Sequence, residues 1–401
     1  MRRFVFYLFI IAVFLLAPLL ALPRQADRLP AATAAPAPTA RPATTRPYRA
    51  VWVSYLEWQQ MDFSSEQVFA ADAAAMLDNI RDLGATVVLA QVRPFGDALY
   101  PSAYYPFSHL CTGTQGQDPG FDPLAILVEK AHARGLELEA WVNPYRIQAG
   151  GAPALCDASP ARLHPDWVKY TADGTYLDPA SAAVRQYIAD AVGELCANYD
   201  VDGIHFDDYF YPTTDPDFDA ADYAASGTAL PQDDWRRENV NALMELCHAA
   251  ARRYGVRFGA APAGTPEQNY TLQYSDAARW LRQGTVDYLM PQLYWGVEYT
   301  KNGDDSQSFA KLAAAWAALP RAAGVKLYAG LGAYRVGAGD GSDTGSEWFT
   351  GHALADQLNL LESLGVQGAG LYRYASLFGT SDRVELAISE VDAIKHVWQI
   401  D

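Results

Sequence analysis

The chain has 401 residues, 50% of them hydrophobic and 12% aromatic, so it can bury the core of one large domain or two ordinary ones and is too apolar to be disordered. Its formal net charge is −17, but residues 1–47 hold six Arg and one Asp, which leaves −22 for residues 48–401. This balance argues against nucleic acid as the main partner, because a protein that binds a polyanion needs a basic surface.

The N-terminal residues predict export. Two Arg residues precede an uncharged apolar stretch that ends at residue 22, which favours a secretory signal peptide in residues 1–22. An uncleaved membrane anchor is the alternative, and it would be the chain's one contact with a membrane. Residues 23–47 are mostly Pro, Ala, Thr and Arg, a composition typical of an extended linker. We therefore expect the folded domain to comprise residues 48–401.

Four cysteines lie in this predicted exported domain, where disulfides can form. The pattern places Cys111 and Cys156 in loops on one face, and Cys196 and Cys247 inside helices. We predict a disulfide between Cys111 and Cys156, with four free thiols as the alternative.

From residue 48 onward, an amphipathic helical stretch, a Gly and a short apolar run recur. Gly just past a helix end adopts the left-handed conformation at little cost, so each Gly predicts a helix end followed by a strand. These glycines are Gly84, Gly135, Gly255, Gly284, Gly324 and Gly365. The apolar runs are 48–55, 85–93, 136–143, 203–209, 257–262, 286–295, 326–334 and 368–375.

Alternating strands and helices predict a parallel sheet, and eight such units predict a closed (β/α)8 barrel. The connections that leave the second, third and fourth strands are long, whereas those that lead from helix to strand are short. In this fold the active site lies at the C-terminal ends of the strands, where the long loops are expected.

Alternation along each strand separates side chains that face the helices from side chains that face the barrel axis. The axis side carries carboxylates, amides, an Arg and aromatic rings, where an ordinary barrel has branched aliphatic residues. The candidates are Gln91, Arg93, Glu139, Trp141, Asn143, His205, Asp207, Asp208, Gln292, Tyr294 and Tyr372. Such a set suits a carbohydrate, because aromatic faces pack on sugar rings, amides bind hydroxyls and carboxylates transfer protons. The alternative is a buried ion-pair network of Arg93, Glu139 and Asp207 that fills the barrel.

Glycoside cleavage usually needs one carboxyl group that protonates the leaving oxygen and a second group that acts as base or nucleophile. Asp207 and Asp208 are the candidates for the acid. Because neighbouring residues on a strand point apart, we do not expect them to form the pair themselves. The second group would be Glu139, Asp97, Glu57 or an N-acetyl group of the substrate.

Six motifs extend across most of the predicted domain. They are Tyr48-Arg-Ala-Val-Trp-Val, Gln91-Val-Arg-Pro-Phe-Gly-Asp-Ala-Leu-Tyr-Pro-Ser, Ala140-Trp-Val-Asn-Pro-Tyr-Arg, Tyr176-Leu-Asp-Pro, Val201-Asp-Gly-Ile-His-Phe-Asp-Asp-Tyr-Phe-Tyr-Pro and Met290-Pro-Gln-Leu-Tyr-Trp. Together they resemble the glycosyl-hydrolase-like family ten, a barrel family of exported and cell-surface bacterial proteins. The resemblance covers about residues 48–380.

This resemblance implies a glycosidase of the cell envelope that acts on peptidoglycan strands freed of their peptides, a glycan that contains N-acetylhexosamine. It maps the acidic end of the fourth strand onto Asp207 and Asp208. Its polar strand ends map onto Gln91, Arg93, Asn143, Tyr145, Arg146, Gln292 and Tyr294. One departure is Glu139, which stands where the family pattern has His.

Further substrate-binding candidates lie in the loops at the strand ends. They are Asp97, Tyr100, Trp295 and Arg373. Four arginines, Arg93, Arg146, Arg335 and Arg373, lie at or just after strand ends in an acidic domain. Since a forked guanidinium suits a carboxylate, one or two of them are expected to bind the lactyl carboxylate of muramic acid. The alternative is that they pair with neighbouring Asp residues.

Other functions remain open from the sequence. The fourth-strand motif also resembles chitinase-type family eighteen, but His205 and Tyr209 replace its inner Asp and its catalytic Glu. The histidines show no metal-binding spacing, so we expect no metal and no cofactor; a metal-dependent hydrolase would rest on His205-x-Asp207 alone. A non-catalytic glycan-binding protein on the same fold would need neither Asp207 nor Asp208.

Overall fold

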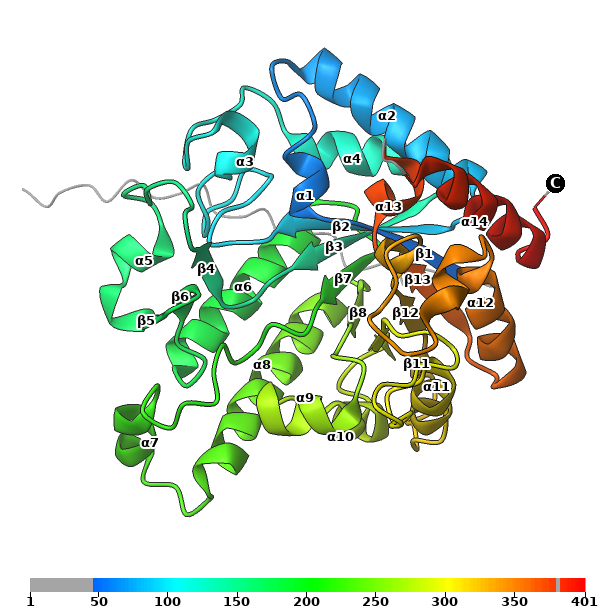
Figure 1. The fold of residues 1–401 in the computed structure, drawn as a ribbon. Helices are drawn as coiled ribbons and strands as arrows, with labels where there is room; N and C mark the ends of the chain where they lie inside the picture. The colour runs from blue at the N-terminus through cyan, green and yellow to red at the C-terminus, as the bar shows by residue number, and fades with distance from the viewer. Residues whose placement is uncertain (1–45, 380–382, 401) are drawn as a thin grey trace, which may run out of the picture. The chain divides into compact units, whose positions relative to one another are not determined.

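The computed structural model describes residues 46–379 and 383–400. A parallel sheet curls around the centre of this part of the chain, and helices lie along its outside (Figure 1). The predicted signal peptide, and all but the last two residues of the predicted linker, lie outside the described residues. Among the described helices, none is both long and apolar enough to cross a membrane.

Each predicted strand run contains a strand of this sheet. The strands are β1 (Tyr48–Val53), β2 (Val87–Arg93), β3 (Glu137–Val142), β7 (Gly203–Phe206), β8 (Arg257–Ala260), β9 (Tyr288–Leu289), β10 (Gln292–Leu293), β11 (Lys326–Leu327), β12 (Ala329–Leu331) and β13 (Gly368–Leu371). Their order is β10-β12-β13-β1-β2-β3-β7-β8-β9-β11, and every neighbouring pair is parallel.

The chain itself joins the two ends of this order, so the sheet closes. β9 and β10 form one predicted strand that is interrupted at Met290 and Pro291, and β11 and β12 form another that is interrupted at Tyr328. Pro291 has no N–H to donate, but its carbonyl oxygen accepts from the N–H of Gly330 at 2.8 Å, which keeps the two strands in register across the break. Within the described residues, eight strands therefore form the predicted (β/α)8 barrel.

A helix of the outer layer follows each barrel strand. These helices are α2 (Glu66–Asp82), α4 (Pro123–His132), α6 (Ala182–Asn198), α8 (Gln232–Arg252), α10 (Ala277–Gln283), α11 (Phe309–Ala317), α12 (Ala353–Ser363) and α14 (Val384–Val397). Further helices lie in the loops: α1 (Tyr55–Trp58), α3 (His109–Thr112), α5 (Pro160–Leu163), α7 (Ala220–Ser226), α9 (Pro266–Leu272) and α13 (Tyr374–Phe378).

Local sequence explains where the outer helices begin and end. Ser65 caps α2 by accepting from the N–H of Val68 at 3.3 Å, and Asp122 caps α4 by accepting from the N–H of Ala125 at 3.0 Å. The six glycines that the sequence predicts as helix ends all have positive φ, between 68° and 91°. Each therefore provides the left-handed turn that returns the chain to the next strand.

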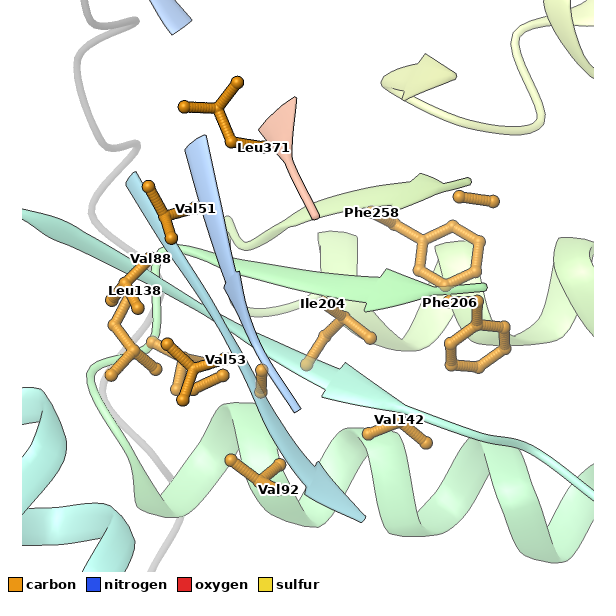
Figure 2. Close-up of a cluster of buried hydrophobic side chains, with 14 of the residues drawn as sticks. Val51, Val53, Val88, Val92, Leu138, Val142, Ile204, Phe206, Phe258 and Leu371 are labelled. Carbon is orange, nitrogen blue, oxygen red and sulfur yellow. The ribbon is translucent and has the colours of Figure 1, made fainter. Parts of the chain in front are cut away.

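The main hydrophobic core lies between the strands and the helices. Val88, Leu138 and Ile204 belong to it, and Figure 2 shows these and other apolar side chains on β1, β2, β3, β7, β8 and β13. A separate buried cluster, which includes Trp52, Trp141 and other aromatic residues, fills the inside of the barrel. The predicted alternation is thus confirmed for these side chains, and the barrel interior is aromatic rather than aliphatic.

The loop after β3 forms a small antiparallel sheet that the sequence did not predict. Its strands are β4 (Arg146–Ala149), β5 (Val168–Thr171) and β6 (Gly174–Leu177), in the order β4-β6-β5. β4 begins three residues after Asn143, so it holds Arg146 close to the C-terminal end of β3.

Candidate active site

A cavity of about 230 Å³ lies at the C-terminal end of the barrel. It is lined by residues from or just beyond several strands: Trp52, Trp141, Asp207, Asp208, Tyr209, Ala261, Gln292, Tyr294, Tyr334 and Tyr372. Six of the predicted site residues are in this lining, namely Trp141, Asp207, Asp208, Gln292, Tyr294 and Tyr372. The cavity therefore combines two carboxyl groups and an amide with aromatic walls.

Asp207 and Asp208 both line this cavity, which corrects the expectation that they point apart. That expectation assumed that the strand continues through both residues. β7 ends at Phe206, so the two residues lie in irregular chain, where the alternation of a strand no longer applies. The structure thus brings together two carboxyl groups that the sequence pattern separated.

Asp207 is 4% exposed and accepts three hydrogen bonds. Its Oδ2 accepts from the indole N–H of Trp141 at 3.2 Å and from the side-chain amide of Asn143 at 2.5 Å, and its Oδ1 accepts from the backbone N–H of Tyr209 at 3.1 Å. These donors fix the position of the carboxyl group against the cavity wall.

Gln91 lies behind Asn143 and determines which way its amide points. The Nε2 of Gln91 donates to Oδ1 of Asn143 at 2.6 Å, while Oε1 of Gln91 accepts from the backbone N–H of Tyr55 at 2.8 Å. Because the oxygen of Asn143 is occupied in this way, its N–H group must face Asp207. Gln91 and Asn143, both predicted to bind substrate, thus position a carboxyl group.

Asp208 is partly buried and is held by two Gln side chains. Gln273 donates to its Oδ2 at 2.8 Å, and Gln292 donates to its Oδ1 at 3.1 Å. Gln292 also donates to the backbone oxygen of Ala261 at 2.9 Å. Sequence reasoning missed Gln273, because it follows α9 in a loop and belongs to no strand pattern.

The pKa values of both carboxyl groups are raised. Burial, followed by the neighbouring charge of Asp208, raises the pKa of Asp207 to about 7, while the positive charge of Arg146 opposes this shift. Burial also raises the pKa of Asp208, against the hydrogen bonds from Gln273 and Gln292. Near neutral pH the pair can therefore hold one proton and one negative charge.

Tyrosine and tryptophan rings form the walls of the cavity. Tyr294 stacks on Tyr372 with ring centres 5.7 Å apart, and Tyr334 meets both of these rings edge-on. Trp52 contacts Tyr372 edge-on at 6.0 Å. Neither Trp52 nor Tyr334 was among the predicted site residues.

His205 lies below Trp52 inside the barrel. Its Nε2 is 3.2 Å from the indole N–H of Trp52, and its Nδ1 is 2.7 Å from the hydroxyl of Tyr288. Burial lowers the pKa of His205 to about 3, so the ring is neutral at physiological pH. In the described part of the chain, no three His, Cys, Asp or Glu side chains gather in a way that would hold a metal ion.

Glu139 lies deeper in the barrel and does not line the cavity. It accepts from the hydroxyls of Tyr288 at 2.5 Å and Tyr48 at 3.1 Å, and its carboxylate is 3.0 Å from Arg257. Gly203 makes room for it, since a Cβ at this position would lie 2.6 Å from Cδ of Glu139. Its position does not support a role as the second catalytic group. Glu139 instead forms an ion pair with Arg257, and not the predicted network with Arg93 and Asp207.

Arg93 faces away from the axis, which corrects the predicted orientation. The pairing of β2 with β3 shifts between Gln91 and Arg93, so that Arg93 lies opposite Val142, a residue of the outer core. This bulge reverses the side on which Arg93 points. Its guanidinium is buried, 4.3 Å from the ring centre of Tyr105.

Six other predicted site residues lie outside the cavity lining: Asp97, Tyr100, Tyr145, Arg146, Trp295 and Arg373. Tyr100 and Tyr145 are buried in the outer core, and Trp295 packs against it. Asp97 accepts from the ring of His109 and the side chain of Gln115 within its own loop. Arg373 forms an ion pair with Glu57, another candidate for the second group, which also accepts from Ser54. Asp97 and Glu57, the other candidates for the second catalytic group, are both absent from the cavity lining.

The predicted disulfide between Cys111 and Cys156 is not present, and no disulfide joins any cysteines among the described residues. Cys111 is buried in the outer core, whereas Sγ of Cys156 lies against Gly116, 2.9 Å from where a Cβ would be. The backbone N–H of Cys156 donates to Gln115 instead, at 3.0 Å, which ties this loop to its neighbour without a covalent bond.

The fold is shared with solved glycosidases. The glycoside hydrolase domain of PgaB (BpsB) from Bordetella bronchiseptica has a TM-score of 0.56 at 17% identity, over 85% of this chain and 98% of that one. The catalytic domain of β-amylase from Paenibacillus polymyxa has a TM-score of 0.52 at 13% identity, over 86% of this chain and 98% of that one. At these identities the likeness shows the barrel fold alone.

Sequence relatives are closer. Glycosyl hydrolase YngK of Bacillus subtilis (strain 168) is 35% identical over 319 residues, which are 73% of this chain and 61% of the relative. Glycosyl hydrolase DigH of Escherichia coli (strain K12) is 34% identical over 346 residues, 75% of this chain and 77% of the relative. The chain therefore spans less than two thirds of the Bacillus relative. The model of the glycosyl hydrolase-like 10 family matches residues 47–349, and the chain belongs to this family.

Proposed function

We propose that this protein is an exported glycoside hydrolase that cleaves glycosidic bonds of cell-envelope glycan, with peptide-free peptidoglycan strands as its substrate. The observation that carries the proposal is the placement of Asp207 and Asp208 in one cavity with aromatic walls. Family membership supports the reaction class. The apolar N-terminal segment supports export, and the resemblance of the motifs supports the substrate.

Asp207 is the general acid in this proposal. Its raised pKa lets it keep a proton near neutral pH, and its Oδ2 is occupied by two donors, so the proton belongs on Oδ1. Asp207 donates this proton to the glycosidic oxygen as the bond from that oxygen to the anomeric carbon breaks. The leaving sugar departs as an alcohol, and hydrolysis is completed when the oxygen of a water molecule bonds to the anomeric carbon and the proton that this water loses passes to a carboxylate of the pair.

Asp208 is the ionised partner. Its two Gln donors stabilise the negative charge, and this charge balances the positive charge that develops at the anomeric carbon. The rings of Tyr294, Tyr372 and Trp141 provide apolar faces for the sugar. This division of roles rests on the raised pKa of Asp207 and on the two Gln donors to Asp208.

Incubation of the purified protein with peptide-free peptidoglycan strands and with chitin oligomers tests the proposal. We expect products from the peptidoglycan strands and a loss of at least about 100-fold in Asp207→Asn and Asp208→Asn. Circular dichroism of both variants controls for folding. An absence of products from every glycan, while wild type still binds them, would show a glycan-binding protein instead. The anomer of the first product would show whether water attacks directly.

A further inference from the structure

Four arginines lie at or just after the C-terminal ends of barrel strands, and three of them have other contacts. Arg93 is buried beneath an aromatic ring on the outer side of the barrel. Arg373 is paired with Glu57. Arg335 donates to two backbone carbonyl oxygens, at 3.3 and 3.4 Å. These three therefore have roles within the protein.

Arg146 differs from them. Its Nε donates to the backbone oxygen of Pro94 at 3.1 Å, and its guanidinium lies 4.8 Å from the ring centre of Phe95 and 5.2 Å from that of Tyr209. Among the residues that the structure describes, no carboxylate lies within ion-pair distance of it, and its two terminal nitrogens donate to no protein acceptor. The stem and plane of the guanidinium are thus fixed, while its two outer N–H groups remain available.

The position of Arg146 places this group beside the cavity. Tyr209, on which the guanidinium packs, lines the cavity with Asp207 and Asp208. The positive charge of Arg146 also opposes the rise in pKa that burial causes at both carboxyl groups. A fixed, half-buried fork of two N–H donors suits a carboxylate, which can accept from both at once.

We propose that Arg146 binds a carboxylate carried by the sugar substrate and so selects acidic glycans over neutral ones. This inference rests on the proposed function, because it concerns the same cavity. Such a carboxylate belongs either to the lactyl group of a muramic acid or to the C6 position of a uronic acid. The proposed function favours the first source, and the chemistry of Arg146 fits both.

Binding measurements test the role of Arg146. Affinity is measured in an Asp207→Asn background, so that turnover does not interfere. The variant is Arg146→Met, which removes the positive charge and keeps a long side chain. Arg162→Met, at an exposed position in the same loop, is the matched control. The probes are peptide-free peptidoglycan strands, the same strands with their lactyl carboxyl groups amidated, chitin oligomers and oligogalacturonate.

We expect Arg146→Met to weaken binding of untreated strands by about 10- to 100-fold, and to leave binding of amidated strands and chitin unchanged. Arg162→Met should bind every probe as the background does. Equal binding of untreated and amidated strands by the background protein would overturn the proposal, as would an equal loss on both in Arg146→Met. Tighter binding of oligogalacturonate than of peptidoglycan strands would overturn muramic acid as the source of the bound carboxylate, and it would support a carboxylate site at Arg146.

These outcomes are distinct from failure of the proposed function. If no glycan is cleaved by the wild-type protein but Arg146→Met still loses affinity for untreated strands alone, the hydrolase proposal fails and the carboxylate site stands. If glycans are cleaved and the amidated strands bind as well as the untreated strands, the hydrolase proposal stands and the carboxylate site fails.

Discussion

The indole N–H of Trp52 donates to Nε2 of His205 at 3.2 Å, and this contact determines how protons are arranged beneath the cavity. Because an indole N–H can only donate, Nε2 of the neutral ring is unprotonated and Nδ1 carries the hydrogen. Nδ1 then donates to the hydroxyl of Tyr288, whose own hydrogen goes to Glu139. The hydrogen bonds therefore run in one direction, from the cavity wall to a buried carboxylate.

Replacement of Glu139 should affect stability more than chemistry. Glu139→Gln leaves the partly buried guanidinium of Arg257 with Glu137 as its one carboxylate partner among the described residues, so we expect the free energy of unfolding to fall by about 2–4 kcal/mol, measured by urea denaturation. Glu137→Gln, on the more exposed side of the same guanidinium, should cost less. Folded Glu139→Gln should keep most of its hydrolytic activity. Inactivity comparable to that of Asp207→Asn would instead assign Glu139 a catalytic role.

The pH dependence of hydrolysis should follow Asp207. An acid must be protonated to act, so kcat/KM on peptidoglycan strands with amidated lactyl carboxyl groups should fall as pH rises through about 7. Because the charge of Arg146 lowers the pKa of Asp207, its loss in Arg146→Met should move this basic limb to higher pH. A neutral substrate keeps carboxylate binding out of the comparison. A basic limb at the same pH in wild type and in Arg146→Met would show that Arg146 has no electrostatic influence on Asp207.

The buried carboxyl group should make the fold less stable as pH rises. The folded protein keeps the proton of Asp207 up to about pH 7, whereas an unfolded chain loses it near the ordinary carboxyl pKa. Stability is therefore greatest at low pH with respect to this group, and it falls as pH rises toward 7. At pH 7.5 the free energy of unfolding of Asp207→Asn should exceed that of wild type by about 1–3 kcal/mol.

The difference in free energy of unfolding between Asp207→Asn and wild type, measured at two pH values, separates the effect of ionisation from other effects of the substitution. Near pH 4 both the folded and the unfolded wild-type chain hold most of the proton, so the advantage of Asp207→Asn should shrink there. Asn also loses acceptor capacity toward the donors around Asp207, which is why the expected gain is smaller than the pKa shift alone implies. A variant less stable than wild type at pH 7.5 would contradict a costly burial of this charge.

The cysteines should titrate as thiols. No disulfide joins them in the structure, so mass spectrometry after alkylation without reductant, under denaturing conditions, should show four modified residues. Wild-type protein should unfold at the same urea midpoint with and without reductant. A loss of two modified residues, restored by reductant, would show that the bridge between Cys111 and Cys156 forms.

Local sequence determined the eight strand runs of the barrel and the helices between them. The glycines that end helices and the apolar runs after them depend on neighbouring residues alone, since a left-handed turn and a period of two are properties of a short segment. For the same reason, the outward direction of side chains such as Val88 and Leu138 was predictable. The aromatic and polar character of the barrel interior, with Trp141 and Asp207, was legible from the same alternation.

Tertiary structure decided the site itself. Arg93 turned outward because the pairing of β2 with β3 shifts at Gln91, and Asp208 joined Asp207 because the ladder of β7 ends at Phe206. Both depend on hydrogen bonds to a neighbouring strand, which a sequence pattern does not contain. Gln273 contacts Asp208 and Arg146 packs on Tyr209 from the long connections after β8 and β3, whose course depends on packing across the mouth of the barrel. Periodicity predicts only where regular pairing continues, and the catalytic end of a barrel is where that pairing stops.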